Sequence, residues 1–439
     1  MTTTQPEPAG VVPTAPQASA AGRPTRTPIG SASRILLVAA GLFVLLSLIA
    51  TVTDSPDLTS SGTFGASLRL AVPIGLAGLG GLWAERAGVV NIGLEGMMIL
   101  GTWFGAWAGW KYGVWWGVPA AVLGGAAGGL VHAIATVTFG VDHIVSGVAI
   151  NILGGGVTRY LGSLVFTADT GGSASLSPGV RGRIGTFTMP FLSGGDLFGW
   201  QTPDILGRIE RWDWVVLSDV AGLGRGLTRD VSYLTLIAIA LVPITWYLLW
   251  RTAFGLRLRS VGENPTAADS LGVPVYRFKY IAVVVSGALA GLGGAVLSIE
   301  AARVYREGQV AGRGFIGLAA LIFGNWRPGG LAAGSAFFGF TDALQLRDPG
   351  SVHALLLFVA VAAGLLALVA ARRGVLLRSG IIFVVGMLFL VWFLVQDSVP
   401  AQFVAITPYV ATLLVLGVFS QRLRPPAADG VRWRKGEHT

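Results

Sequence analysis

Long apolar runs recur along almost the whole chain, and they constrain its fold more than any other feature. A helix that crosses a hydrocarbon layer of about 30 Å needs about 20 predominantly apolar residues. Only 12% of the 439 residues are charged, roughly half the fraction usual in soluble domains, and the mean hydropathy is +0.68. The sequence therefore predicts an all-α polytopic membrane protein.

These runs predict about twelve membrane-spanning helices in a membrane domain at 35–419. The run at 313–324 is too short to cross as a straight helix, so we expect a broken crossing there. A re-entrant segment is the alternative, but it would turn every later basic segment outward, against the usual bias. The spans lie near 35–53, 64–84, 88–109, 114–139, 143–166, 231–250, 280–299, 313–324, 329–346, 355–371, 380–396 and 401–419.

Basic residues predict the orientation of the spans, because lysine and arginine collect on cytoplasmic loops. With the N-terminus inside, the short outer flanks carry few basic residues, namely Lys111, Arg303, Arg306, Arg313 and Arg347. We therefore expect both termini in the cytoplasm. The same bias explains most of the net charge of +9, so a nucleic-acid partner is not expected.

Three segments differ from the spans in composition. Residues 1–34 are rich in Pro, Thr, Ala and Ser and are predicted to be a disordered cytoplasmic N-terminus. Residues 420–439 form a basic cytoplasmic tail. Segment 168–230 is a polar external insertion, expected to hold short strands or an interfacial helix. It either caps the outer mouth or contacts substrate, and the sequence leaves both open.

The inner loop at 251–279 contains a helix signal that a plain connector would not need. A helix start, a short apolar face and a glycine stop follow one another: Asn264 and Pro265; Ala267, Ala268 and Leu271; and Gly272. An exposed helix of this kind suits docking to a cytosolic partner. The alternative is that it lies on the membrane, with its basic neighbours on anionic lipid.

Four polar residues lie deep in the predicted spans. Asn91 and Glu95 are four apart and would share one face of the helix over 88–109; Asn151 and Asp342 lie in two other spans. An ionisable group at membrane depth usually faces a bundle interior or a watery path. All four are candidates for the substrate path, and hydrogen bonding between helices is the alternative for each.

Two aromatic residues lie in or just after the short run at 313–324. Phe315 and Trp326 suit stacking on a flat solute. For Trp326 the alternative is an anchor at the inner membrane interface, where tryptophan is enriched.

The residue inventory excludes several kinds of chemistry. The chain has no cysteine, so thiol catalysis and cysteine-based metal sites are excluded. It has four histidines, and they do not form an HExxH pattern. No lysine follows a glycine, so a GxxxxGK[ST] phosphate loop is absent. No cofactor is expected on this chain, and if ATP drives it, another chain hydrolyses the ATP.

Several stretches together resemble a known family. Ala267-Ala268-x-x-x-Gly272 is similar to the EAA-x-x-x-G coupling-helix motif of ABC importer permeases, with Thr266 in place of the glutamate. The chain also resembles the branched-chain amino acid and simple-sugar permease superfamily, and within it permeases of nucleoside importers. The stretches are ERAGVVNIGLEGMM (85–98), DHIVSGVAINILGGGVTRYL (142–161), GRGFIGLAALIFGNWRPGG (312–330), FGFTDALQL (338–346) and the tail at 407–437.

The resemblance implies a fold similar to the type II, vitamin B12 importer class, with two related bundles at 64–166 and 280–346. It implies a cytosolic ABC ATPase, a second related permease in a heterodimer, an extracellular substrate-binding lipoprotein and a bacterial cell membrane with its lipid. The long N-terminus, the insertion at 168–230 and an extra helical hairpin at 351–400 depart from the pattern.

Three functions therefore compete. The first is the permease of an ABC importer for nucleosides or a simple sugar such as ribose. The second is a secondary transporter that uses Glu95 or Asp342 as an ion site, which would not need a docking helix. The third is a membrane-embedded enzyme, which the lack of a paired-carboxylate or metal-ligand cluster in the loops disfavours.

Overall fold

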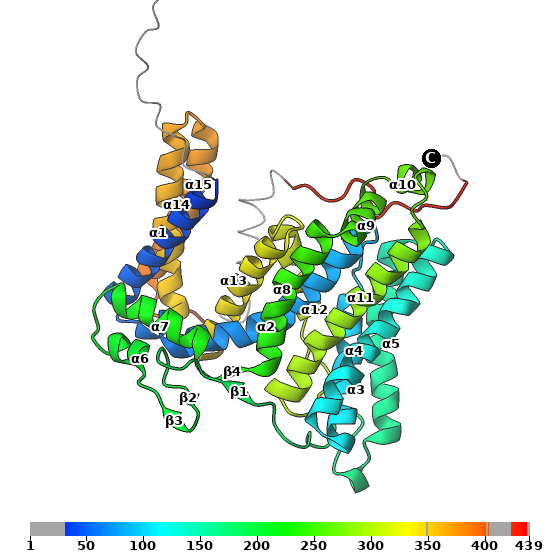
Figure 1. Cartoon of the computed structure of the whole chain (residues 1–439). Helices are drawn as coiled ribbons and strands as arrows, with labels where there is room; N and C mark the ends of the chain where they lie inside the picture. Colours follow the sequence, from blue (N-terminus) through cyan, green and yellow to red (C-terminus); the bar gives the residue numbers. More distant parts are fainter. Residues whose placement is uncertain (1–30, 348–349, 401–402, 404–422, 437–439) are drawn as a thin grey trace, which may run out of the picture. The chain divides into compact units, whose positions relative to one another are not determined.

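A computed structural model describes residues 31–347, 350–400, 403 and 423–436 (Figure 1). Most of the predicted N-terminal segment and nearly all of the last predicted span, 401–419, therefore lie outside the described residues. The chain divides into two compact units, 1–44 and 45–439. The first contributes the start of α1, which begins at Ser31, inside the leader that the composition predicts to be disordered.

The described part of the chain is mainly helical. Seven of its helices are long and apolar enough to cross a membrane, and two shorter apolar helices accompany them; the number twelve stays a prediction. The α-helices are α1 Ser31–Val52, α2 Ser61–Arg86, α3 Leu94–Tyr112, α4 Val114–Ala133, α5 His143–Val165, α6 Ile205–Glu210, α7 Leu217–Thr228, α8 Tyr233–Arg251, α9 Ala253–Glu263, α10 Pro265–Ser270, α11 Val275–Ala295, α12 Arg313–Phe323, α13 Pro328–Arg347, α14 Ser351–Arg372 and α15 Leu376–Val395.

Short helical turns and strands complete the described secondary structure. Five-to-six-residue π-helical turns extend α4 and α11, a local widening that is uncommon in helices. These elements are η1 Pro56–Leu58, η2 Ile134–Thr138, η3 Ala168–Thr170, η4 Val296–Ala301, β1 Thr186–Phe187, β2 Asp196–Leu197, β3 Trp200–Gln201 and β4 Val231–Ser232.

Helix α3 starts later than the sequence predicts. The backbone at Gly88 has a φ of +77°, a conformation that glycine adopts without steric cost. Beyond it, Asn91 Oδ1 accepts a hydrogen bond from the Gly93 N–H (3.0 Å), a side-chain turn of the kind that competes with helix. Asn91 therefore precedes α3, and the prediction that Asn91 and Glu95 share a helix face is wrong.

Helices α4 and α11 pack with their backbones in close contact. A Cβ atom added at Gly287 would lie 2.3 Å from the Gly125 carbonyl oxygen, and one added at Gly125 would lie 2.2 Å from the Gly287 oxygen. Gly125 and Gly129 on α4, like Gly287 and Gly291 on α11, have the four-residue spacing that brings membrane helices together. Glycine is therefore required at this crossing.

Both predicted bundles contribute to one packed core. Helix α11 packs against α2, α3 and α4, and α2 in turn packs against α12 and α13. A single cluster of buried apolar residues includes Leu79 of α2, Trp103 of α3 and Phe338 of α13. The described helices of 64–166 and 280–346 thus do not form two separate hydrophobic cores.

The segment at 302–326 joins opposite ends of the helices. Near its start, the Arg303 guanidinium donates to the Gly182 carbonyl oxygen (2.9 Å); near its end, the Trp326 carbonyl oxygen accepts from Arg86 Nη2 (2.6 Å). Helix α12 itself has 11 residues, about 16 Å at 1.5 Å per residue. The segment is thus a stretch of bends and turns followed by a half-length helix, and it does not return to the end where it began.

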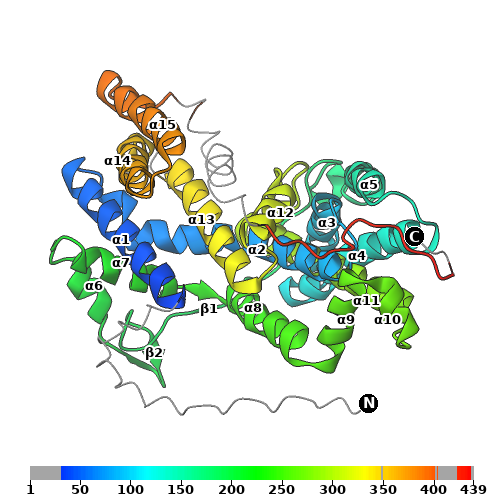
Figure 2. The same ribbon diagram turned by 90° about the horizontal axis from the view of Figure 1, so that it is seen from above.

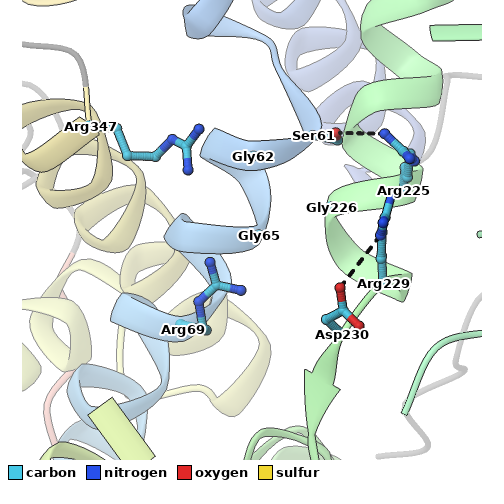
Figure 3. Close-up of a pocket in the computed structure, with 9 residues that line it drawn as sticks. All are labelled: Ser61, Gly62, Gly65, Arg69, Arg225, Gly226, Arg229, Asp230 and Arg347. Carbon is cyan, nitrogen blue, oxygen red and sulfur yellow. Dashed lines mark hydrogen bonds and ion pairs between the residues drawn. The ribbon is translucent and has the colours of Figure 1, made fainter. Parts of the chain in front are cut away.

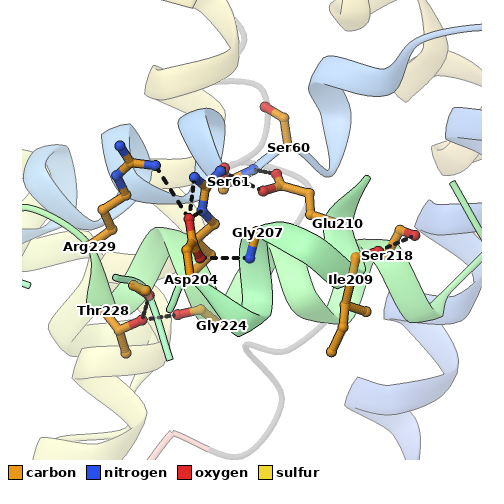
Figure 4. Close-up of polar contacts among 12 residues, drawn as sticks. Ser60, Ser61, Asp204, Gly207, Ile209, Glu210, Ser218, Gly224, Thr228 and Arg229 are labelled. Atoms are coloured by element: carbon orange, nitrogen blue, oxygen red, sulfur yellow. Dashed lines mark hydrogen bonds and ion pairs between the residues drawn. The ribbon is translucent and has the colours of Figure 1, made fainter. Parts of the chain in front are cut away.

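The insertion at 168–230 is fastened to the start of α2. Strand β1 pairs with β4, and β2 pairs with β3, both antiparallel. Arg225 on α7 forms ion pairs with Asp204 (2.7 Å) and Glu210 (2.9 Å). Glu210 also accepts a hydrogen bond from the Ser61 N–H (2.9 Å). Figure 4 shows this group of contacts beside the first turn of α2.

Contacts group the loops at two ends, which we call the α10 end and the insertion end. At the α10 end, Arg86 pairs with Glu263 (3.9 Å), and the Arg424 N–H donates to Asn325. At the insertion end, the Val114 N–H donates to the Arg181 carbonyl oxygen (3.0 Å). The pattern of basic residues in the sequence also predicts that the loops at each end lie on one side of the membrane. Which end faces the cytoplasm stays a prediction.

Helices α14 and α15 form the hairpin at 351–400. They pack against each other and lie side by side in both views (Figures 1 and 2). At the start of α14, Ala354 belongs to an apolar cluster with Leu344 of α13 and Leu46 of α1. This cluster attaches the start of the hairpin to the end of α13 and to the last turns of α1.

Candidate translocation and coupling sites

Glu95 closes the N-terminus of α12. Its Oε1 accepts a hydrogen bond from the Gly312 N–H and its Oε2 one from the Gly314 N–H, each at 2.8 Å. The side chain lies in the first turn of α3, and the residue is only 9% exposed. A carboxylate at a helix N-terminus satisfies backbone donors and meets the positive end of the helix dipole. Glu95 therefore joins α3 to the half-length helix α12.

The two asparagines make hydrogen bonds with both ends of their amides. Asn91, which is fully buried, donates from Nδ2 to Ser286 Oγ on α11 (2.8 Å) and accepts from the Gly93 N–H. Asn151 on α5 donates to the Ile92 carbonyl oxygen (3.0 Å) and accepts from the Gly96 N–H (2.8 Å). Both asparagines therefore use their polar groups for hydrogen bonds that join different segments of the chain.

Asp342 and Phe315 lie on two neighbouring helices. Asp342 on α13 forms an ion pair with Arg313 at the start of α12 (3.1 Å), and both side chains are mostly buried. Phe315, in the first turn of α12, is 46% exposed. Among the five residues predicted for the substrate path, Phe315 has the most exposed side chain, and Glu95, Asp342 and Phe315 all lie at or beside α12.

The loop predicted at 251–279 contains two short helices, α9 and α10. Asn264 Oδ1 accepts a hydrogen bond from the Ala267 N–H (2.9 Å) and caps α10, Pro265 is its first residue, and Gly272 follows with a φ of +79°. Ala268 is buried, whereas Leu271 is 85% exposed. Helix α10 thus lies where the sequence predicts a helix and presents an apolar side chain to its surroundings.

A second polar group at the α10 end was not predicted from the sequence. The Trp326 indole N–H donates to Glu85 at the end of α2, so this tryptophan is buried in the protein and neither stacking on a solute nor anchoring at the interface describes it. Asp429 of the C-terminal tail lies beside Glu85, and burial raises the pKa of Asp429 to about 7. The pairing joins residues far apart in the sequence, which local patterns do not reveal.

A cavity of about 270 Å³ lies at the insertion end between α2, α7 and the end of α13. Figure 3 shows four guanidinium groups around it, with Arg69 and Arg347 on one side and Arg225 and Arg229 on the other. Two of these cations already have acidic partners, because Arg225 binds Asp204 and Glu210 and Arg229 contacts Asp204 and Asp230. Its remaining lining residues are Ser61, Gly62, Gly65, Gly226 and Asp230.

These features define a multi-pass membrane protein with a half-length helix, α12, packed among longer helices and an exposed short helix at one end. The family described as the branched-chain amino acid transport system, permease component, matches residues 63–347. The chain therefore belongs to this family of transport permeases. No solved structure matches it.

Three relatives sharpen the comparison. The guanosine ABC transporter permease protein NupQ of Bacillus subtilis (strain 168) is 34% identical over 85% of this chain and 96% of its own length. The nucleoside ABC transporter permease protein NupC of Lactococcus lactis subsp. cremoris (strain MG1363) is 30% identical over 84% and 96%. The putative glucose ABC transporter permease protein TsgC13 of Haloferax volcanii is 34% identical over 66% and 78%.

The relatives are transport subunits rather than enzymes. They support the permease of an ABC transporter, and they give no support to the ion-coupled carrier that Glu95 and Asp342 left open. The contacts of these two residues, with the N-terminus of α12 and with Arg313, also account for both carboxylates without a transported ion.

Proposed function

We propose that this chain forms the translocation path of an ATP-driven importer for nucleosides. The observation that carries the proposal is the similarity over nearly the whole chain to permeases named for guanosine and nucleosides. A simple sugar is the second candidate, because a relative named for glucose is as similar over two thirds of the chain.

Helix α10 is our candidate for the contact with a cytosolic ABC ATPase. It is short and capped at both ends, and Leu271 beside it is exposed, which suits insertion into a groove of a partner. The proposed coupling residues are Asn264, Pro265, Ala267, Ala268 and Gly272. This assignment makes the α10 end cytoplasmic, in line with the basic residues at that end.

The other proposed partners are a second permease and an extracellular substrate-binding lipoprotein. Two relatives named as permeases occur in each of two bacteria: NupQ and NupP in Bacillus subtilis, NupC and NupB in Lactococcus lactis. This chain is 34% identical to NupQ and 26% identical to NupP. A heterodimer in a bacterial cell membrane, in which this chain is the NupQ-like subunit, is therefore our proposal.

Within this chain, we place the path beside the broken crossing at 302–326. Phe315 faces outward from α12 and is the proposed contact for a flat base. Asn91, Asn151, Glu95 and Asp342 hold the surrounding segments at fixed positions through the hydrogen bonds and the ion pair described above. In this arrangement their contribution to transport is geometric.

Uptake by a deletion strain tests the proposed substrate class. Cells that lack this gene, and the same cells with the gene restored, are given radiolabelled purine nucleosides, pyrimidine nucleosides, ribose and glucose in separate assays. We expect the restored gene to raise uptake of at least one nucleoside, and unlabelled nucleosides to compete. Restored uptake of ribose or glucose without any nucleoside would favour the sugar permease instead.

A further inference from the structure

The C-terminal segment at 423–436 crosses the α10 end without forming a helix or strand. Figure 2 shows this red segment running from the side of α12 toward α4 and α5. At its start the Arg424 N–H donates to Asn325 Oδ1 (2.8 Å). Near its far end Arg434 donates to the Phe139 carbonyl oxygen (3.3 Å), and Arg432 pairs with Asp142 (3.8 Å). We call residues 423–436 the C-terminal strap.

The middle of the strap is bound to α9 and to the turn after α2. The Ala428 N–H donates to the Gly262 carbonyl oxygen (2.9 Å), and the Ala427 N–H donates to Glu263 Oε2 (3.1 Å). Ala428 is buried, and its carbonyl oxygen would lie 3.0 Å from a Cβ atom added at Gly88. The strap is therefore packed into this end rather than resting on it.

The last part of the strap holds α10 itself. Trp433, only 9% exposed, donates from Nε1 to Thr266 Oγ1 (3.2 Å), and its ring centroid lies 5.3 Å from that of Tyr276. Two residues on, Lys435 Nζ lies 3.6 Å from Asp269 Oδ1. Both contacts reach polar side chains of α10, while Ala267 and Leu271 remain exposed.

Within the described part of the chain, α10 has few other supports. It has six residues, whereas isolated helices shorter than about 12–15 residues are marginal in water. Its buried residues are Pro265 and Ala268, and its packing neighbours among the helices are α9 and α11. An indole that is itself buried therefore adds a substantial third support.

We propose that the C-terminal strap is a positioning element for α10, with Trp433 as its anchor, and that it keeps α10 in the orientation in which the ATPase engages it. The claim about the ATPase rests on the proposed function, because it needs an ATPase as partner. The claim that the strap positions α10 concerns this chain alone and is testable without a partner.

The experiment compares Trp433→Ala with two matched variants in the full-length chain. Trp433→Phe keeps a ring beside Tyr276 but has no N–H to donate, and Val431→Ala truncates an exposed residue of the same segment. Hydrogen exchange of the α10 amides is measured on the purified permease. ATP hydrolysed per nucleoside transported is measured on the assembled importer at equal amounts of folded complex.

We expect Trp433→Ala to speed exchange in α10 about tenfold, as the loss of an aromatic pair and a hydrogen bond implies, and to raise the ATP consumed per nucleoside. Trp433→Phe should recover most of both, and Val431→Ala should match the native chain. Unchanged α10 exchange in Trp433→Ala would overturn the positioning role, and unchanged coupling despite faster exchange would overturn the link to the ATPase.

Two further arms keep the result decisive. If Trp433→Ala does not fold, Thr266→Val removes the same hydrogen bond from the α10 side and should speed exchange by a smaller factor. If the native chain shows no ATP-dependent uptake, the proposed function fails, while the exchange data still decide whether the strap holds α10.

Discussion

Glu95 is the residue where a structural role and an ion-coupling role make opposite predictions. Its two carboxylate oxygens accept from the Gly312 and Gly314 N–H groups, and glutamine offers only one acceptor oxygen. We expect Glu95→Gln to destabilise the protein by about 1–3 kcal/mol, the usual cost of a buried donor without a partner. Accumulation of substrate per folded molecule should remain, as measured by thermal unfolding in detergent and by uptake.

The matched control for this change is Glu307→Gln. Glu307 forms an exposed ion pair with Arg159 (3.3 Å), and exposed pairs contribute about 0–1 kcal/mol. Native stability in Glu95→Gln together with loss of energised accumulation would contradict the structural role and return Glu95 to an ion-coupling site.

We expect Asp429 to make the docking of the C-terminal strap dependent on pH. Burial raises its pKa to about 7, although its hydrogen bond with Glu85 and the charges of Lys279 and Arg86 oppose the rise. The docked state therefore favours the protonated carboxyl. Its stabilisation is complete below the ordinary pKa of about 3.9 and is lost as the pH rises through about 7.

We therefore expect the strap to be released more readily at about pH 8 than at about pH 6. Hydrogen exchange of the amides around Ala428 measures this release, with the intrinsic pH dependence of exchange subtracted. Asp429→Asn cannot ionise and should abolish the difference between the two conditions. A difference of the same size in Asp429→Asn would show that another group is responsible.

The crossing of helices α4 and α11 requires glycine, which has no side chain, where the two backbones meet. A Cβ atom at Gly287 would lie 2.3 Å from a backbone oxygen of α4, so the helices must separate to admit it. We expect Gly287→Ala to cost roughly 1–3 kcal/mol, the range for overpacked cores, and to lower the yield of folded protein. Gly155→Ala on α5 is the control, because its added Cβ meets nothing within 4 Å.

An equal yield and melting temperature for the two glycine variants would contradict the close packing of α4 and α11. A loss confined to Gly287→Ala would confirm it. The comparison is matched in chemistry, since both changes add one methyl group to a glycine inside a long apolar helix.

Elements with local signals were predictable from the sequence, and those fixed by distant contacts were not. Helix α10 follows from Asn264-Pro265 and Gly272, which lie next to it in the chain. The first turn of α3 was misplaced because the side chain of Asn91 closes a turn instead of extending a helix. Hydrophobic patterns indicate which residues are buried. They do not indicate where a side chain bonds to the nearby backbone and so prevents a helix from starting.

The candidate site was predictable as a set of residues but only partly as an arrangement. Burial of Glu95 and Asn151 follows from their apolar surroundings, whereas their partners, the N–H groups of α12 and of Gly96, lie in other segments. The strap joins Trp433 to Thr266, more than 160 residues apart in the sequence. Contacts of that separation leave no periodic trace in a single sequence.

For the whole molecule, labelling of single cysteines tests the proposed direction in the membrane. The native chain has no cysteine, so each introduced thiol is the only one present. We expect an impermeant maleimide to label Trp200→Cys in the insertion from outside intact cells and to miss Ala267→Cys and Val431→Cys. All three positions are exposed in the structure, so permeabilised cells should label every variant. Labelling of position 431 in intact cells would reverse the predicted orientation.

The source of energy for transport is the most direct test of the central claim that ATP drives this importer. Uptake of a labelled nucleoside is measured in cells treated with a protonophore while their ATP is held constant, and in cells depleted of ATP with the membrane potential kept. The account predicts uptake that persists in the first condition and stops in the second. Uptake that collapses with the protonophore and survives the loss of ATP would contradict it.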